Sequence, residues 1–213
     1  MGKKHPFLKK ILLLLAGLLV MTLMALTANL FGLIPPPPVP PYRTTGQAAS
    51  VANIVEYTDF QCPACRNASK TLRAIMAANP GKIRLTFRHF PLPMHALAVP
   101  AAMAAECAGE QGKFWEYADM LYDNQQQWTG SARAKDTFAS YAKTLGLDER
   151  RFIECAESPR TRAVIIRDDL AAQYRRIDST PTFFLNGRKL QAGTKALTEE
   201  LAIMGLAMPP EVK

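Results

Sequence analysis

The sequence predicts an α/β fold in which a β-α-β unit and a C-terminal β-β-α unit flank an all-helical block, behind one N-terminal apolar segment. Strand-like runs occur on both sides of the block, at 51–57, 82–90 and 182–191. Helical periodicity fills the interval from about 94 to 176. An uncharged apolar run, 11–34, precedes all of these and is long enough to cross a membrane.

The formal net charge of +8 is partly concentrated at the N-terminus, where four lysines lie within residues 1–10. The remainder of the chain is only mildly basic. It contains no dense run of lysine and arginine interleaved with aromatic residues, and this argues against nucleic acid as a partner.

The run 11–34 is predicted to be a transmembrane signal-anchor. As a helix it extends roughly 36 Å, at about 1.5 Å per residue, enough for a hydrocarbon core of about 30 Å. The basic segment 1–10 then lies in the cytoplasm, and residues from 35 onward lie outside it, in the periplasm or an equivalent space. The alternative is a cleaved signal peptide, but Ala25 and Ala28 form a poor cleavage site and apolar residues continue beyond them.

A proline-rich linker is predicted over 35–50. Six of the seven residues in 35–41 are proline, which favours an extended polyproline II rod, and the following residues 44–50 are small and polar. We therefore expect a stiff spacer that holds a catalytic domain away from the bilayer.

The first half of the α/β domain is predicted over 51–93. A buried strand at 51–57 is followed by a helix that begins near Cys62 and has apolar positions on one face. Asn79-Pro80-Gly81 ends this helix, and the alternation of 82–90 indicates a second strand.

The helical insertion is predicted over 94–176, and Ser158-Pro159 is typical of a helix start within it. The second half of the domain, 177–213, contains a strand at 182–185, the hairpin pair Asn186-Gly187, a return strand and a final helix at 195–206. This order is that of a thioredoxin fold interrupted by a helical insertion.

The motif Cys62-Pro63-Ala64-Cys65 at the start of a helix predicts thiol–disulfide chemistry. Unpaired N–H groups and the helix dipole favour the thiolate of Cys62, which is the expected nucleophile, and Cys65 is the expected resolving thiol. A zinc site and an inert disulfide are alternatives. The first is disfavoured because Cys107 and Cys155 are single and far apart in sequence, and the second because so tight a ring is strained.

The chain resembles the DsbA-like family of thioredoxin-fold thiol:disulfide oxidoreductases. The resemblance rests on three motifs in the family's order: Phe60-Gln61-Cys62-Pro63-Ala64-Cys65, Phe87-Arg88-His89-Phe90-Pro91-Leu92, and Thr180-Pro181-Thr182-Phe183-Phe184-Leu185-Asn186-Gly187. It covers roughly 51–206 and implies an enzyme that needs no cofactor and no metal.

The resemblance also implies roles for three further residues. Pro181 matches the family's cis proline opposite the active cysteines, with Thr180 before it; without the family context, a trans proline at the start of a strand is equally acceptable. Glu56 matches a buried acidic residue that exchanges a proton with Cys65, and the alternative is a solvated glutamate near a strand end.

Cys107 and Cys155 are expected to form a structural disulfide, because an exported protein seldom keeps two free thiols beside a redox motif. Some family members have such a bond. The alternative is a pair of reduced, buried cysteines. His89 and His95 are interpreted as packing or surface residues.

The leading functional hypothesis is an oxidant of unfolded or cysteine-containing exported proteins, reoxidised by a membrane redox partner. Ala64 departs from the family's usual histidine, which predicts a weaker oxidant than the family's type member. The alternatives are a reductase or isomerase kept reduced by a membrane donor, with which Thr180 is compatible, and a tethered module that binds metal or clients without turnover.

Overall fold

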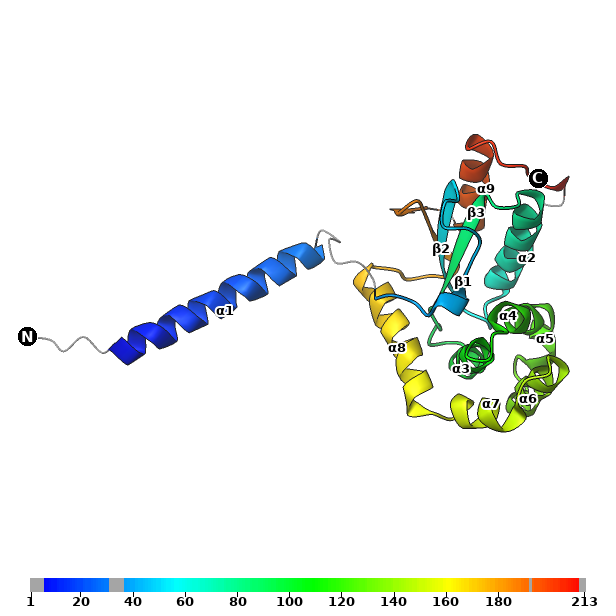
Figure 1. The fold of residues 1–213 in the computed structure, drawn as a ribbon, viewed down its shortest axis with the longest axis horizontal. Coiled ribbons are helices and arrows are strands. Elements are labelled where there is room, and N and C mark those ends of the chain that lie inside the picture. Colours follow the sequence, from blue (N-terminus) through cyan, green and yellow to red (C-terminus); the bar gives the residue numbers. More distant parts are fainter. Residues whose placement is uncertain (1–5, 31–36, 192, 211–213) are drawn as a thin grey trace, which may run out of the picture. The chain divides into compact units, whose positions relative to one another are not determined.

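The chain folds into two compact units, Met1–Pro37 and Pro38–Lys213, each of which is described here by itself. The structure is a computed structural model, and it describes residues 6–30, 37–191 and 193–210 (Figure 1).

The N-terminal unit contains one helix, α1 (Pro6–Leu30). Its stretch Lys9–Thr27 has a mean hydropathy of 2.3, so by length and composition the helix can cross a bilayer. Residues 31–34 of the predicted anchor, and residues 1–5 of the basic segment, lie outside the described residues.

The second unit is built on one mixed sheet, which has five strands among the described residues, in the order β1-β3-β2-β4-β5. The central strands β2 and β3 are parallel, and the other neighbours are antiparallel. The strands are β1 (Thr44–Thr45), β2 (Ala52–Thr58), β3 (Ile83–His89), β4 (Thr182–Leu185) and β5 (Arg188–Lys189).

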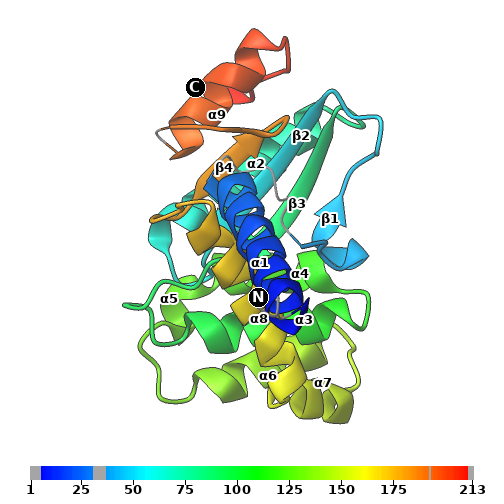
Figure 2. The same cartoon turned by 90° about the vertical axis from the view of Figure 1, so that its left-hand side faces the viewer.

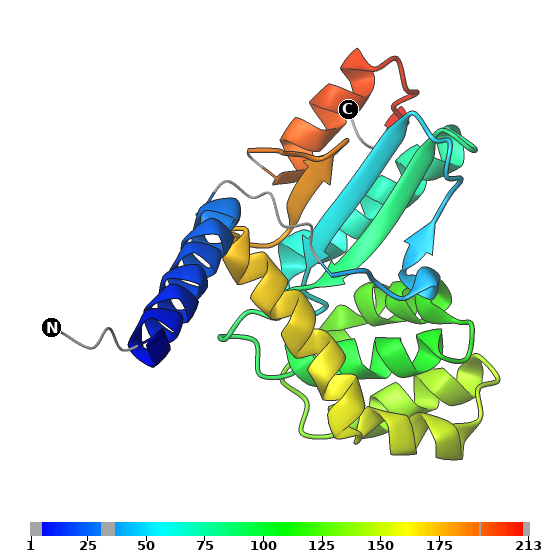
Figure 3. The ribbon, with the colours of Figure 1, turned by 60° about the vertical axis from the view of Figure 1, so that its left-hand side comes forward.

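Helices cover both faces of this sheet. Alternate residues of β2 point to opposite sides, so each face offers apolar side chains to a different set of helices. Ile54 belongs to an apolar cluster with α2 (Pro63–Ala78) and α9 (Gly193–Ile203), whereas Tyr57 belongs to a cluster with α8 (Pro159–Tyr174). Figure 3 shows α8 crossing in front of the sheet and α2 behind it.

The predicted helical insertion is present, and Figure 2 shows its helices gathered at one end of the sheet. They are α3 (Ala98–Gly109), α4 (Phe114–Asp123), α5 (Gln125–Trp128), α6 (Ala134–Thr144) and α7 (Glu149–Ala156), and α8 leads back to the sheet. Fully buried aromatic residues such as Tyr117 and Trp128 form its core. Ser158 caps α8 as predicted, because its hydroxyl accepts a hydrogen bond from the Arg160 N–H.

The predicted hairpin between the last two strands is also confirmed. Asn186 and Gly187 both have positive φ, 49° and 84°, as a type I′ turn requires.

The structure differs from the linker predicted over 35–50, because residues from Pro38 onward belong to the domain. A 3₁₀ turn, η1 (Pro41–Arg43), buries Arg43 completely, and Thr44 pairs with Thr86 at the edge of the sheet. Gly46 then turns with φ 88°, where a Cβ would collide with the Ile83 carbonyl oxygen. The small, polar composition of 44–50 is typical of a spacer, and it does not reveal this tertiary pairing.

Candidate active site

The two cysteines of the Cys62-Pro63-Ala64-Cys65 motif lie at the start of α2. Cys62 is the N-cap residue, with extended backbone angles, and Pro63 is the first helical residue, where its missing N–H costs nothing. Cys65 is one turn further in and completely buried, whereas 7% of Cys62 is exposed. Both thiols are free in this structure.

The loop before Cys62 is held by two polar side chains of its own. Asp59 is buried, and its carboxylate accepts hydrogen bonds from the N–H groups of Gln61 and Leu92, at 2.7 and 2.8 Å. It also pairs with His95 Nδ1 at 2.7 Å, while Gln61 Oε1 accepts from the Leu97 N–H at 2.8 Å. These contacts tie the loop to the segment that follows β3.

Gln125 holds the same loop from the helical insertion, and sequence reasoning missed it. Its buried Nε2 donates to the carbonyl oxygens of Phe60 and Cys62, at 2.7 and 3.0 Å. A glutamine within a helical block carries no sequence signal for this contact, because the contact joins two elements that only the tertiary fold brings together.

Thr180 and Pro181 lie beside Cys62, although 118 positions separate Cys62 from Thr180. The Thr180–Pro181 bond is cis, as the family resemblance implies. The Cys62 thiol donates to the Thr180 carbonyl oxygen at 3.7 Å. The backbone just before β4 therefore lies within hydrogen-bond reach of the Cys62 sulfur.

The two thiols have opposite acidities. A hydrogen bond from the Cys65 thiol, with smaller contributions from Thr180 and the backbone N–H groups of Cys65 and Ala64, lowers the pKa of Cys62 to about 5 despite partial burial. Burial raises the pKa of Cys65 well above its usual value, and the charges of Cys62 and Glu56 raise it further. At neutral pH the reduced pair therefore holds a thiolate at Cys62 and a thiol at Cys65.

Glu56 is buried, as expected, with 4% of its surface exposed. Burial raises its pKa to about 8, so the carboxyl group is mostly protonated at neutral pH. Its Oε1 has no hydrogen-bond partner among the described residues. Glu56 lines a cavity of about 240 Å³, together with Ser69, Arg73, Asp119 and other residues of α2, β3 and α4.

Cys107 and Cys155 form a disulfide that joins α3 to α7, which agrees with the pairing expected from the sequence. Because the two sulfurs are bonded to each other, neither is a thiolate that could bind a metal. The described residues contain no cluster of histidine, cysteine and acidic side chains that could hold a metal ion.

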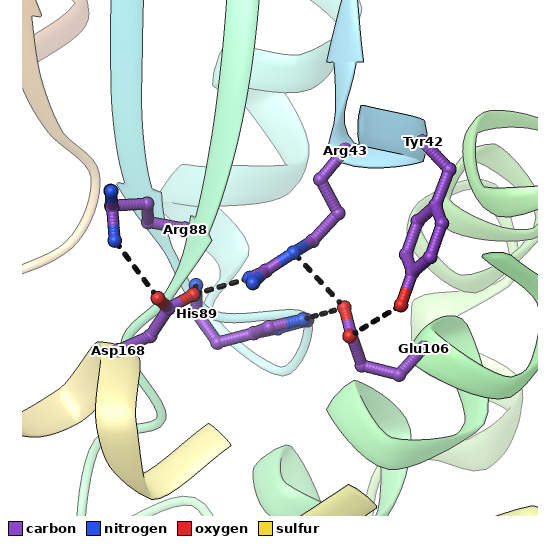
Figure 4. Close-up of polar contacts among 6 residues, drawn as sticks. All are labelled: Tyr42, Arg43, Arg88, His89, Glu106 and Asp168. Atoms are coloured by element: carbon purple, nitrogen blue, oxygen red, sulfur yellow. Dashed lines mark hydrogen bonds and ion pairs between the residues drawn. The ribbon is translucent and has the colours of Figure 1, made fainter. Parts of the chain in front are cut away.

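His89 belongs to a buried charged cluster, shown in Figure 4. Its Nε2 lies 2.9 Å from Glu106 Oε1, and the other Glu106 oxygen accepts from the Tyr42 hydroxyl at 2.9 Å. Arg43 forms ion pairs with both Glu106 and Asp168. The six residues of this cluster are Tyr42, Arg43, Arg88, His89, Glu106 and Asp168.

Comparison with known proteins places this geometry in context. A family profile described as Thioredoxin matches residues 39–201. Among curated proteins, the chain is 39% identical over 155 residues to the Na(+)/H(+) antiporter NhaA 1 of Salinispora arenicola. That match covers 71% of this chain but only 23% of the antiporter, so the chain spans about a quarter of the length of this relative.

Two solved structures are similar to this one. Wolbachia pipientis alpha-DsbA1 has a TM-score of 0.67 at 21% identity, and the match covers 78% of this chain and 92% of that chain, which shows a shared fold. Pseudomonas aeruginosa DsbA2 has a TM-score of 0.63 at 26% identity, with 79% of this chain and 97% of that chain covered.

Proposed function

The chain belongs to the thioredoxin family as a DsbA-like thiol–disulfide oxidoreductase, and from this premise we propose that its Cys62–Cys65 disulfide oxidises the cysteines of exported proteins. The observation that carries the proposal is the opposite displacement of the two thiol pKa values, down to about 5 for Cys62 and well upward for Cys65.

In the first step a client thiolate attacks Cys62 Sγ of the disulfide. The bond between Cys62 and Cys65 breaks, and Cys65 leaves as a thiolate. Because burial makes that thiolate costly, it must take up a proton. Glu56 is protonated near neutral pH, and it is close enough that its ionised form would raise the pKa of Cys65. We propose that Glu56 supplies this proton.

In the second step the other client thiolate attacks the client sulfur of the mixed disulfide, and Cys62 leaves. A thiol of low pKa is a good leaving group, so the acidity of Cys62 speeds release of the oxidised client. The client loses two electrons and two protons. The enzyme gains the electrons and one proton, because Glu56 passes its proton to Cys65 and is then reprotonated by one of the client protons, and the other client proton goes to solvent.

Stabilisation of the Cys62 thiolate favours the reduced enzyme over its disulfide, which makes the enzyme oxidising. We further propose that the backbone at Thr180 and Pro181, beside Cys62, pairs with an extended client segment during exchange.

We propose that residues 11–34 anchor the protein in the cytoplasmic membrane, with 1–10 in the cytoplasm and the catalytic domain outside. The apolar character of Lys9–Thr27 and the preceding lysines support this orientation. A membrane redox partner then reoxidises the pair. The antiporter activity of the curated relatives is not carried over, because the chain covers only a quarter of their length.

The direction of electron flow is tested by equilibrating the full-length protein in glutathione buffers and alkylating its free thiols. A reduction potential above about −200 mV supports the oxidant, whereas a value near that of thioredoxin, about −270 mV, identifies a reductase. Loss of client oxidation in Cys62→Ser excludes a module that only binds clients, and Cys65→Ala accumulates mixed disulfides that identify the clients.

A further inference from the structure

The outward face of α8 carries an exposed apolar stripe. Ile166, Leu170 and Tyr174 follow one another at intervals of four residues, and 50%, 58% and 38% of their respective surfaces are exposed. Residues four apart lie on one side of a helix, so the three side chains form a continuous strip. We refer to these three residues as the α8 stripe.

Two arginines border the α8 stripe. At about 100° per residue, Arg162 and Arg167 lie roughly 140° apart around the helix, with the stripe between them. Both are exposed, and neither forms an ion pair with any residue that the structure describes. Asp169 lies on the same side of α8 as Arg162 by helical position, and its carboxylate accepts a hydrogen bond from Gln173.

The inward face of α8 contacts the start of the domain, which follows the short segment 31–37 between α1 and Pro38. We refer to this segment as the tether. Asp168 forms ion pairs with Arg43, in the turn that follows the tether, and with Arg88 of β3 (Figure 4). An open groove of about 800 Å³ runs alongside, lined by Pro40, Tyr42, Glu110 and α8 residues that include Arg167, and Glu110 is paired there with Arg160 at 3.4 Å. The tether therefore enters at the arginine border of the α8 stripe.

The tether is short. Residues 31–37 separate the last residue of α1 from Pro38, and a chain of that length reaches no more than roughly 30 Å at about 3.6 Å per residue. This limit holds for any backbone conformation. If α1 spans the membrane, α8 stays within reach of the lipid surface.

We propose that the α8 stripe and its two arginines dock on the anionic phospholipid headgroups of the bilayer that holds α1. An apolar strip bordered by cationic side chains is the pattern of interfacial helices. A second copy of this chain fits less well, since a twofold contact would bring like-charged arginines together. The proposal rests on the membrane anchor of the proposed function, but not on the direction of its redox chemistry.

The test places a fluorescent reporter on the stripe. Full-length Leu170→Trp is reconstituted in nanodiscs whose phosphatidylcholine has brominated acyl chains, with and without phosphatidylglycerol. The matched control is Ile203→Trp, because Ile203 is an exposed apolar residue on α9. The two native tryptophans, Trp115 and Trp128, give the background that is subtracted with the parent protein.

Docking predicts that bromolipid quenches the Leu170→Trp reporter much more than the Ile203→Trp reporter. It also predicts that phosphatidylglycerol strengthens this quenching and that salt at about 0.5 M weakens it. Adding Arg162→Gln and Arg167→Gln should lower the ratio of docked to undocked domain roughly 25-fold, at about fivefold per arginine. Unchanged oxidation of a soluble dithiol shows that this variant is folded.

The proposal is overturned if bromolipid quenches the two reporters equally, or if quenching of the Leu170→Trp reporter does not depend on phosphatidylglycerol. The proposal is also overturned if self-association of the protein shields the Leu170→Trp reporter from bromolipid, with or without phosphatidylglycerol. Failure of the anchor is distinguished from failure of docking, because an unanchored protein does not co-elute with nanodiscs at high salt, whereas an anchored but undocked protein does.

Discussion

At the scale of single residues, the proposed chemistry depends on three titratable groups, Cys62, Cys65 and Glu56. The pKa of Cys62 is low because hydrogen-bond donors surround its sulfur at a helix start, whereas burial raises the pKa of Cys65. Burial also raises the pKa of Glu56, so its carboxyl group still carries a proton near neutral pH. Each shift has a local physical cause, and a single substitution can test it.

Replacing Glu56 with glutamine should change how stability depends on pH. The folded pKa of about 8 lies above the usual value of 4.5, so the wild type binds this proton more tightly when folded. Its stability relative to Glu56→Gln should fall by about 1.4 kcal/mol per pH unit between these two values and level off above pH 8. Urea unfolding of both reduced proteins across this range measures the difference, and parallel curves contradict a buried, protonated Glu56.

The same substitution should slow client oxidation at neutral pH by roughly 100-fold, because the proton for Cys65 is lost. In the wild type the rate of this step should decline as pH rises through about 8, and the variant should lack that decline. Stopped-flow oxidation of a model dithiol peptide gives both profiles.

At the scale of elements, two short segments, α5 and the turn η1, each connect parts of the domain that are distant in sequence. Gln125 of α5 connects the helical insertion to the loop that presents Cys62. Arg43 of η1 connects the start of the domain to α3 and α8 through Glu106 and Asp168. These contacts join elements that are distant in sequence.

Gln125→Leu should lower the free energy of unfolding by about 1–3 kcal/mol, since the Phe60 carbonyl oxygen loses its side-chain donor and the Cys62 carbonyl oxygen keeps only the Arg66 N–H. It should also raise the pKa of Cys62 above about 5, because the backbone at the helix start is released. The matched control is Gln127→Leu in the same short helix, since Gln127 is exposed and its side chain donates to the Asn124 side chain. Denaturant titration and thiolate absorbance at varied pH provide the two readouts, and equal behaviour of both variants counts against the role of Gln125.

Arg43→Met should lower the free energy of unfolding by about 3–5 kcal/mol, because Glu106 and Asp168 then lose a buried cation. Lys113→Met is the control. Lys113 pairs with Glu116 at 2.9 Å at the surface, where a pair contributes less than about 1 kcal/mol. Similar losses in both variants, measured by urea unfolding, contradict a supporting role for the buried cluster.

At the scale of the whole molecule, the domain combines a sheet unit formed by both ends of the domain sequence with a helical insertion between them. The Cys107–Cys155 disulfide lies within the insertion and joins α3 to α7. The redox pair lies where the two parts meet, since Cys62 and Cys65 pack in the same apolar cluster as the insertion helices. The insertion is therefore part of the active-site scaffold.

The double variant Cys107→Ala/Cys155→Ala should be less stable by about 4 kcal/mol, because the disulfide closes a loop with a sequence separation of 48. Its Cys62 thiolate should still titrate near pH 5, since the structural bond is separate from the active pair. Unfolding by urea and absorbance titration measure these two properties. An altered Cys62 titration with intact folding contradicts the independence of the two cysteine pairs.

Local patterns were sufficient to predict the α/β order, the start of the active-site helix, and the acidic character expected of Cys62. They also predicted the Asn186-Gly187 hairpin and the Ser158 cap, because in each case the residues that decide the structure are neighbours in the chain. The family resemblance added the cis bond before Pro181, which the structure has, and the role proposed for Glu56; spacing alone determines neither.

Only the tertiary structure decided that residues from Pro38 to Ser50 belong to the domain, that Gln125 supports the Cys62 loop, and that Arg43 lies between Glu106 and Asp168. These contacts join residues far apart in the chain, and neither residue type nor periodicity encodes a distant partner. The energy of a buried charge or carbonyl depends on what surrounds it in three dimensions, and a linear pattern does not contain that information.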